Sequence, residues 1–489
     1  MSKELDNLQP AGVWRYFQEI CKIPRPSKKE EKIAAYLVAF GESLGLETIV
    51  DEIGNILIRK SASPGMEDRK VVVLQSHMDM VCEKNSDTLH DFDTDPIQPY
   101  IEGEWVKARG TTLGADDGIG IAAQLALLAA NDVAHGPIEC LFTMDEETGL
   151  TGAFGLKPDL LKGNILLNLD SEDEGEIFIG CAGGKDTLIS MNYSRTPVGA
   201  GQVGYIVKVS GLKGGHSGDD INKGLGNANK ILNRLLWEAT HRFDMRLSKF
   251  DGGNLRNALA REAEAIITLP KRFAAEFEAY AKEYHQIVRN EFKVTEPALN
   301  VQFKSHDLPD YLFDAATQER LLNALYACPH GVIAMSADIP NFVETSTNLA
   351  SVKTHENRIE ITTSQRSSVE SAKDNVANMV VAVFNLAGGK SVHSDGYPGW
   401  TPNPKSEILD ISVKSYHDLF NSAPKVLAIH AGLECGLIGE KYPRMDMISY
   451  GPTIKGAHSP DERLLINTVQ KFWDLTLDIL KNIPKEQNV

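Results

Sequence analysis

The sequence predicts an α/β protein with a mixed, mainly parallel sheet sandwiched by helices, and with an inserted α+β domain. Three observations support this fold class. Short apolar runs that fit buried strands alternate with helical patterns over residues 1–186 and return in residues 401–489. Between them, residues 187–400 combine longer helices with more closely spaced strands. The chain of 489 residues is also too long for a single simple core.

The first segment contains the predicted elements of a mainly parallel sheet. The strands are expected at 48–51, 55–59, 71–74, 138–143 and 164–169, and the helices at 14–23, 28–44 and 119–130. Ser27 followed by Glu30 predicts a capping box at the start of the second helix. Residues 83–109 are polar and rich in Asp and Pro, which predicts a long surface excursion.

The middle and last segments have their own patterns. In the middle segment, strands are expected at 187–191, 205–210, 264–269, 299–304, 348–354 and 358–364, and helices at 225–240, 272–292, 315–327 and 369–386. The last segment is expected to contain a helix at 408–421, strands at 425–429 and 445–450, and a final helix at 462–480. The α/β alternation therefore resumes after the insertion.

Composition excludes several classes of protein. A formal charge of −17 argues against a nucleic-acid partner, because phosphate binding needs clustered Lys and Arg. There is no apolar signal core at the N-terminus and no apolar run long enough to span a membrane. The six cysteines are scattered without a C-x-x-C pair, as is typical of reduced thiols. A cytoplasmic protein without a membrane or nucleic-acid partner is expected.

Metal-binding side chains follow several predicted strands or lie in adjoining loops. In an extended chain, His77 and Asp79 point to the same side, so a carboxylate can orient the imidazole. Parallel sheets collect such groups at the carboxyl ends of their strands. The candidate ligands are His77, Asp116, Glu147, Asp170 and His458. This set exceeds the needs of one tetrahedral ion and suits two ions roughly 3.5–4 Å apart that share one carboxylate.

The acidic pair Glu146–Glu147 suggests a division of roles. One carboxylate can bind a metal while its neighbour accepts a proton from water. A bare Asp-Glu-Glu turn is more often a solvated surface feature. Here the pair follows an apolar strand, as other candidate ligands do, which favours the functional interpretation.

Five motifs together resemble those of the co-catalytic zinc peptidase superfamily, which includes carboxypeptidases and aminoacylases. They are His-Met-Asp (77–79), Gly-Ala-Asp-Asp-Gly (114–118), Asp-Glu-Glu-Thr-Gly (145–149), Asn-Leu-Asp (168–170) and Gly-Ala-His-Ser (456–459). The resemblance covers essentially the whole chain. The stretches 75–84 and 430–435 resemble, more narrowly, the bacterial aminoacyl-histidine dipeptidases.

The resemblance implies a role for each candidate ligand. Asp116 would bridge two divalent ions, preferably zinc, with cobalt or manganese as alternatives. It implies that His77 and Asp170 complete one site and that Glu147 and His458 complete the other. It also implies a cis peptide after Asp116.

Catalytic roles follow from the same resemblance. Asp79 would orient His77, and Glu146 would be the general base that takes a proton from a metal-bridging water. The hydroxide would then attack the peptide carbonyl.

The insertion at 187–400 resembles the superfamily's lid domain, which mediates dimerisation. The resemblance implies that His216 polarises the scissile carbonyl. It also implies that Asn257 and Arg366 hold the substrate carboxylate, and that Gly432 presents backbone to the substrate. For these four the plainer interpretations are an exposed histidine, surface polar residues and a helix-start glycine. His430 and Glu434 could share a helix face, and we interpret them as structural.

The predicted function is a di-metal dipeptidase that cleaves unblocked dipeptides, including Xaa-His dipeptides such as carnosine. Its partners would be a small peptide substrate and a second copy of the chain. A carboxypeptidase or acylamino-acid deacylase of the same superfamily is an alternative. A catalytically inactive metal-binding interaction protein is an alternative of another class.

Overall fold

The computed structural model describes residues 5–486, which form two compact units. The first unit comprises Met1–Gly180, Trp400–Ala428 and Leu433–Val489, and the second comprises Cys181–Gly399 and Ile429–Gly432. The second unit thus begins six residues before the predicted boundary at residue 187 and includes a short stretch that prediction assigned to the last segment. Residues 1–4, part of the stretch judged to lack a signal sequence, lie outside the described residues.

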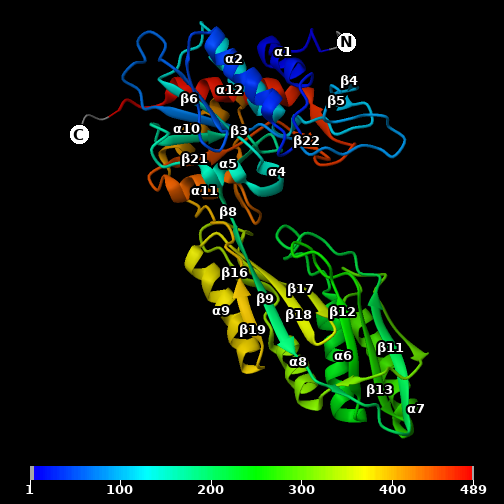
Figure 1. Cartoon of the computed structure of the whole chain (residues 1–489). Coiled ribbons are helices and arrows are strands. Elements are labelled where there is room, and N and C mark those ends of the chain that lie inside the picture. Colours follow the sequence, from blue (N-terminus) through cyan, green and yellow to red (C-terminus); the bar gives the residue numbers. More distant parts are fainter. Residues whose placement is uncertain (1–4, 487–489) are drawn as a thin grey trace. The chain divides into compact units, whose positions relative to one another are not determined.

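The first unit is an α/β unit with two sheets (Figure 1). Its helices are α1 (Ala11–Ile20), α2 (Glu31–Ser43), α3 (Ala115–Ala129), α4 (Glu146–Gly149), α5 (Thr151–Gly155), α10 (Glu407–Phe420), α11 (Glu434–Lys441) and α12 (Ile466–Asn482). Its strands are β1 (Glu47–Val50), β2 (Ile56–Lys60), β3 (Val72–His77), β4 (Pro99–Glu102), β5 (Trp105–Ala108), β6 (Ile138–Thr143), β7 (Ile165–Asn168), β8 (Glu176–Cys181), β20 (Lys425–Ile429), β21 (Asp446–Ser449), β22 (Ile454–Lys455) and β23 (Arg463–Leu465).

The main sheet of this unit has the order β1-β2-β6-β3-β7-β21-β8-β20. Its centre, β6-β3-β7-β21, is parallel, whereas β1, β2 and β8 pair antiparallel with their neighbours. Every residue of β3, β6 and β7 is buried, as expected for strands covered on both faces. For example, α3 packs on β3 and α10 on β21. The predicted fold class, a mixed sheet with a parallel centre, is confirmed.

The second unit is built on an antiparallel sheet. Its strands are β9 (Gly183–Asn192), β10 (Arg195–Thr196), β11 (Gln202–Ser210), β12 (Arg246–Gly252), β13 (Ala263–Pro270), β14 (Asn300–His306), β15 (Leu312–Phe313), β16 (Gly331–Met335), β17 (Val343–Thr354), β18 (Arg358–Ser367) and β19 (Lys390–His393). Its helices are α6 (Ala228–Phe243), α7 (Ala274–Glu291), α8 (Ala315–Ala327) and α9 (Glu370–Leu386), with a 3-10 turn, η1 (Lys271–Phe273).

This sheet has the order β14-β11-β13-β12-β17-β18-β9-β19, with β16 paired to β17. Its strands alternate buried and less buried residues, as in β11 and β13, because one face packs on helices. Helix α6 lies on β11, β12 and β13, and α9 lies on β9 and β18. The core between them includes Leu232, Phe250 and Phe277.

Two predictions about local structure were wrong in the first unit. The excursion at 83–109 contains β4 and β5, which join β22 and β23 in a four-stranded sheet. The strands are too short for a periodicity signal, but Val106 and Ala108 are buried. The predicted capping box does not form either, because Glu30 is itself the N-cap and makes no side-chain cap.

The ends of several elements also differ from prediction. The final helix begins at Ile466 rather than at residue 462, since residues 463–465 form β23. His430 precedes α11, which starts at Glu434, so the two residues do not share a helix face. The helix predicted at 119–130 begins earlier, at Ala115, with non-helical backbone at Asp116 and Asp117. The prediction also missed strands β8, β10, β12, β15, β16, β19 and β22 and helices α4, α5 and α11.

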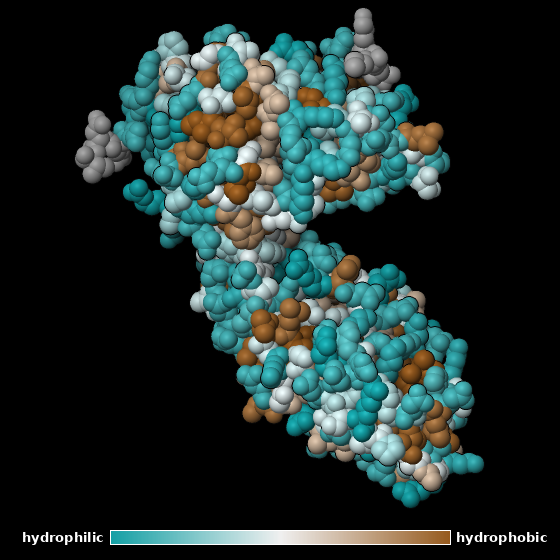
Figure 2. Space-filling model, viewed as in Figure 1, coloured by the Kyte–Doolittle hydropathy of each residue, from teal (hydrophilic) through white to brown (hydrophobic). Residues whose placement is uncertain are grey.

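The surface is mainly hydrophilic, with separate apolar patches on the face shown in Figure 2. Within residues 5–486, no helix is long and apolar enough to cross a membrane.

Candidate active site

Asp116 lies between two groups of candidate metal ligands in the first unit. Its Oδ1 is 3.0 Å from Nε2 of His77, whose Nε2 is also 3.4 Å from Oδ1 of Asp170. Its Oδ2 is 3.2 Å from Nε2 of His458, which is 3.0 Å from Oε2 of Glu147. The five predicted ligands therefore meet, and each oxygen of Asp116 faces one group.

The parallel centre of the sheet explains why His77 and Asp170 meet. His77 ends β3, and Asp170 follows β7, its parallel neighbour, by two residues. Carboxyl ends of adjacent parallel strands lie at the same edge of a sheet. Asp116 enters from the first turn of α3, where the Asp116–Asp117 peptide is cis, as the resemblance implied.

Asp79 contacts both the His77 ring and the turn that carries the acidic pair. Its Oδ1 lies 3.3 Å from Nδ1 of the His77 ring, on the side opposite the ring nitrogen that faces Asp116. The Asp79 carboxylate also accepts the backbone N–H groups of Glu146 (3.0 Å) and Glu147 (3.2 Å). Ser27 donates its hydroxyl to Oδ2 at 2.7 Å. One buried carboxylate thus joins the end of β3 to the turn that carries the acidic pair.

Glu30 supports this turn too, in place of the capping role that the sequence suggested. It accepts the backbone N–H of Asp145 at 2.9 Å and that of Lys28 at 3.0 Å. Ser27 and Glu30 therefore hydrogen-bond to Asp79 and to the backbone of Asp145, rather than forming the predicted capping box.

The electrostatics of the first unit favour a cation among these residues. Although burial disfavours the charged ring, the carboxylates of Asp170, Asp116 and Asp79 raise the pKa of His77 well above its usual value. Hydrogen bonds with Asp116 and Glu147 raise the pKa of His458 to about 11. Burial raises the pKa of Asp170 to about 8. Groups that attract protons this strongly also attract divalent cations.

Two further details fit a metal. Glu147 Oε1 is buried and has no hydrogen-bond partner among the described residues. Histidine nitrogen and carboxylate oxygen are also the donors that zinc and similar ions accept. Among residues 5–486, four groups of possible ligands have atoms within 4.8 Å of one another. Three of them contain predicted ligands, namely His77/Asp116/Asp170, Asp116/Glu147/His458 and His77/Glu146/Glu147, and the fourth is Glu30/Asp79/Asp145.

Glu146 lies beside these ligands but has a different environment. Burial, and secondarily the charges of Asp170 and Glu434, raise its pKa well above the usual value. A carboxyl group in such a place readily keeps a proton that it has accepted, which is the property a general base needs before it returns the proton.

A row of buried polar side chains, which sequence reasoning missed, crosses the sheet behind the ligands. Asn168 donates to Oε1 of Gln75 at 2.6 Å, and Ser449 donates to Oδ1 of Asn168. At the other end, Glu434 accepts from Gln75 Nε2 (2.6 Å) and from Thr143 Oγ1 (2.7 Å). Gln75 and Asn168 are register partners, as are Asn168 and Ser449.

This polar row is visible in the sequence only as polar residues inside apolar strands. Gln75 and Asn168 each stand two positions before a candidate ligand, on the same side of the strand. Glu434 was interpreted as structural, and its contacts agree with that interpretation. Burial raises the pKa of Glu434 to about 7.

In the second unit, three of the four predicted residues lie in one cluster. Arg366 on β18 is buried, and its Nη2 lies 3.3 Å from His216 Nε2. Its Nη1 donates to the hydroxyl of Tyr397 at 2.9 Å. Gly432 faces the same Tyr397 ring, where a Cβ would come within 2.8 Å of it. This cluster contains the guanidinium of Arg366 together with a nearby carboxylate, that of Asp219, which lies 3.3 Å from Nδ1 of His216. The group in the first unit consists mainly of carboxylates.

Asn257 lies next to this cluster through its backbone. Its carbonyl accepts the N–H of Ser217 at 2.8 Å, and Ala258 forms a bridge with His216, while Asn257 itself is exposed. His430 also belongs here, since its Nε2 is 2.7 Å from Ser346 Oγ. These contacts agree with the interpretation of His430 as a structural residue.

Tyr397 is the residue of this cluster that the sequence did not reveal. It stands in Gly396-Tyr397-Pro398-Gly399, at the end of the segment predicted as the inserted domain. A tyrosine flanked by glycine and proline is a common loop residue, so the sequence offered no usable signal. Its importance comes from the contact with Arg366.

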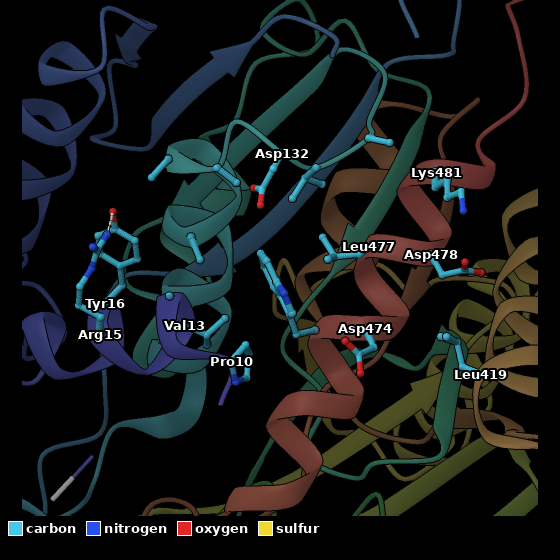
Figure 3. Close-up of a pocket in the computed structure, with 17 residues that line it drawn as sticks. Pro10, Val13, Arg15, Tyr16, Asp132, Leu419, Asp474, Leu477, Asp478 and Lys481 are labelled. Atoms are coloured by element: carbon cyan, nitrogen blue, oxygen red, sulfur yellow. Dashed lines mark hydrogen bonds between the residues drawn. The ribbon is translucent and has the colours of Figure 1, made fainter. Parts of the chain in front are cut away.

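The first unit also contains a cavity of about 650 Å³ among α1, α3, α10 and α12 (Figure 3). Its lining includes Val13, Tyr16, Leu477 and Lys481 but none of the predicted site residues. We therefore assign it no part in the chemistry.

Comparisons with known proteins identify the family. The model of peptidase family M20/M25/M40 matches residues 73–482. The cytosol non-specific dipeptidase of Escherichia coli (strain K12) is 47% identical over 481 residues, which cover 98% of this chain and 99% of that protein.

Solved structures give the same result. The aminoacylhistidine dipeptidase from Vibrio alginolyticus has a TM-score of 0.94 and 46% identity, with 100% of both chains covered. A tripeptidase from Staphylococcus aureus has a TM-score of 0.56 and 17% identity, covering 97% of this chain and 99% of that one, and therefore shows the fold alone.

Proposed function

This chain belongs to peptidase family M20/M25/M40 and is a dipeptidase, and we propose that it cleaves unblocked dipeptides, Xaa-His dipeptides among them, at a two-metal centre. The observation that carries the proposal is the placement of Asp116, whose two oxygens face His77/Asp170 and His458/Glu147 respectively. The names of the relatives, a non-specific dipeptidase and an aminoacylhistidine dipeptidase, support this substrate class.

The proposed ligands are His77 and Asp170 for one ion, Glu147 and His458 for the other, and Asp116 for both. We propose zinc, although the same donors accept cobalt or manganese. When bound, the ions supply a Lewis acid for the scissile carbonyl and lower the pKa of water. The chain's own residues supply the rest of the chemistry.

Glu146 is the proposed general base. Its carboxylate accepts a proton from the attacking water and later gives it to the leaving amine. Asp79 holds the His77 ring through Nδ1 and, through the backbone of residues 146 and 147, holds Glu146 in place. The two roles are linked by one side chain.

For the second unit we propose the roles that the family resemblance implies. An N–H group of the His216 ring donates a hydrogen bond to the substrate carbonyl oxygen, and Arg366 with Asn257 binds the substrate carboxylate. Gly432 presents backbone to the substrate. The buried, forked guanidinium of Arg366 supports the assignment, since this geometry suits a carboxylate.

We also propose that the protein is a cytosolic homodimer that assembles through the second unit. Strand β16 supports this, because Val332, Ile333 and Met335 on it are exposed and apolar. In the described part of the chain β16 pairs only with β17, which leaves one strand edge open to a partner.

A metal-reconstituted enzyme assayed on a panel of dipeptides tests the proposal. Free dipeptides, including carnosine, should be hydrolysed, and N-acetylated dipeptides should not. The reverse preference would indicate a carboxypeptidase or deacylase.

The catalytic role of Glu146 is tested by Glu146→Ala. This variant should lose about 10²–10⁴-fold in turnover while it keeps two ions per chain. Loss of the ions together with the activity would contradict the role of Glu146 as base.

A further inference from the structure

Two buried, oppositely charged residues bind the backbone around the loop that carries Asp116. Arg25 is 3% exposed and Glu462 is 2% exposed. Neither forms an ion pair with a side chain among the described residues. A buried charge is costly unless it is hydrogen-bonded, and for both residues the hydrogen bonds go to main-chain groups.

Glu462 accepts four consecutive backbone N–H groups. Its Oε2 accepts from Leu113 (2.7 Å) and Gly114 (3.0 Å), and its Oε1 accepts from Ala115 (2.8 Å) and Asp116 (3.3 Å). The first N–H groups of a helix have no partner within the helix, and α3 begins at Ala115. The carboxylate therefore fixes the main chain from which the Asp116 side chain projects.

Arg25 binds the same loop from its carbonyl side. Its Nη2 donates to the carbonyl of Gly114, and its Nη1 donates to the carbonyls of Met78 (3.0 Å) and Asp79. Arg25 thus joins the loop before Asp116 to the residues directly after His77. Gly114 has a φ of 66°, and a Cβ there would lie 2.7 Å from the guanidinium, so this contact requires glycine.

Together the two residues connect three segments that are far apart in the sequence. Glu462 stands four residues after His458 and binds the Asp116 loop, while Arg25 joins that loop to the end of β3. Each of the three segments carries a proposed metal ligand. The contacts go to main chain, so they fix the segments themselves rather than single side chains.

We propose that Glu462 and Arg25 are positioning residues that hold the ligand-bearing segments in place for metal binding. The inference rests on the two-metal centre proposed above. Neither residue contacts substrate or metal in this account. Residues that orient a ligand from behind typically change metal affinity by about 10–100-fold when substituted.

Glu462→Gln tests the inference. The amide nitrogen of glutamine cannot accept a hydrogen bond, so two of the four N–H groups lose their acceptor. Zinc titration of the metal-free protein, in competition with a chromogenic chelator, should show an affinity about 10–100-fold weaker than wild type. Because Asp116 serves both ions, both should be weakened.

Glu139→Gln provides a matched control. Glu139 is 1% exposed and accepts the N–H groups of Lys162 (2.8 Å) and Gly163 (3.0 Å) and the Nε of Arg59 (2.7 Å). It lies near the start of β6, whose other end leads to the acidic pair. Its substitution should lower the melting temperature without changing zinc affinity. This separates a loss of stability from a loss of positioning.

Two milder variants keep the test decisive if Glu462→Gln does not fold. Glu462→Asp keeps the charge but shortens the side chain, and Arg25→Lys keeps the charge but loses the fork; each should weaken zinc binding. Wild-type zinc affinity in a folded Glu462 or Arg25 variant overturns the inference. A wild-type protein that binds fewer than two zinc ions instead overturns the proposed metal centre, and this inference with it.

Discussion

The two units of the chain assemble functional residues in different ways. In the first, a parallel centre brings together strand ends that are far apart in the sequence, and the residues it collects are mainly carboxylates. In the second, an antiparallel sheet and its loops collect the basic residues Arg366 and His216. These compositions are the basis for proposing a cation site in the first unit and a carboxylate site in the second.

The difference shows how topology limits the kind of site. Parallel neighbours end at the same edge, so each strand can deliver one ligand to a shared point. Antiparallel neighbours end at opposite edges, so a cluster must be completed by loops, as it is by Tyr397 and Gly432. Substitutions in the two units should accordingly fail in different ways.

The largest effect is expected at Asp116, the proposed shared ligand. Asp116→Asn removes the charge that faces both groups, so zinc content should fall from two ions to near zero and turnover by more than about 10⁴-fold. Elemental analysis and a dipeptide assay measure the two quantities. Asp461→Asn, an exposed carboxylate near His458, should change neither. Retention of both ions in Asp116→Asn would exclude Asp116 as the bridging ligand.

The pH dependence of stability should have opposite signs at Glu434 and His430, which are four residues apart but belong to different units. Burial raises the pKa of Glu434 to about 7, so the folded state binds more protons than the unfolded state between about pH 4.5 and 7. In metal-free protein, ionisation of this carboxyl should lower the free energy of unfolding by about 2.5 kcal/mol as the pH rises from 5 to 8.

Urea unfolding of wild type and Glu434→Gln at those two pH values measures this cost, because only wild type carries the titrating group. A variant that loses as much stability as wild type on going from pH 5 to 8 would show that Glu434 does not titrate in this range.

His430 should act in the opposite direction. Burial lowers its pKa to about 4, so between about pH 6.5 and 4 the unfolded state binds more protons. The second unit should therefore lose about 2.5 kcal/mol of unfolding free energy as the pH falls from 7.5 to 4.5. His430→Gln, which can still bond with Ser346, should lose less over the same interval. Equal losses in both proteins would show that folding does not lower the pKa of His430.

The smallest effect is expected at Arg366. Arg366→Lys loses the bidentate fork, so KM for a dipeptide should rise by about 10–100-fold with a smaller change in kcat. Arg256→Lys, at an exposed arginine with an accessible side chain, is the matched control and should leave KM unchanged. For the wild-type enzyme, replacing the dipeptide with its C-terminal amide should raise KM by the same factor. For that amide, Arg366→Lys should raise KM little further. If Arg366→Lys raised KM for the amide as much as it raised KM for the dipeptide, this result would contradict a contact between Arg366 and the substrate carboxylate.

Much of the first unit could be predicted because its signals are local. One apolar strand ends in His77, and another is followed shortly by Asp170. Both patterns can be recognised without any knowledge of which strands lie beside them. In the second unit, strands such as β12 and β16 were missed, since they have no distinctive period. Predicted element ends failed where contacts from distant segments decide them, as at β23 and α12.

The sequence by itself therefore determined the fold class, the candidate ligands and the insertion between them, because hydrophobic period and motif spacing are written along the chain. Only the tertiary structure decided which oxygen of Asp116 faces which group, and which buried residues hold them. Glu462 was predicted to begin a helix, and Gln75 stood unnoticed in a strand. Their tasks arise from backbone N–H groups and side chains that folding brings to them from hundreds of positions away.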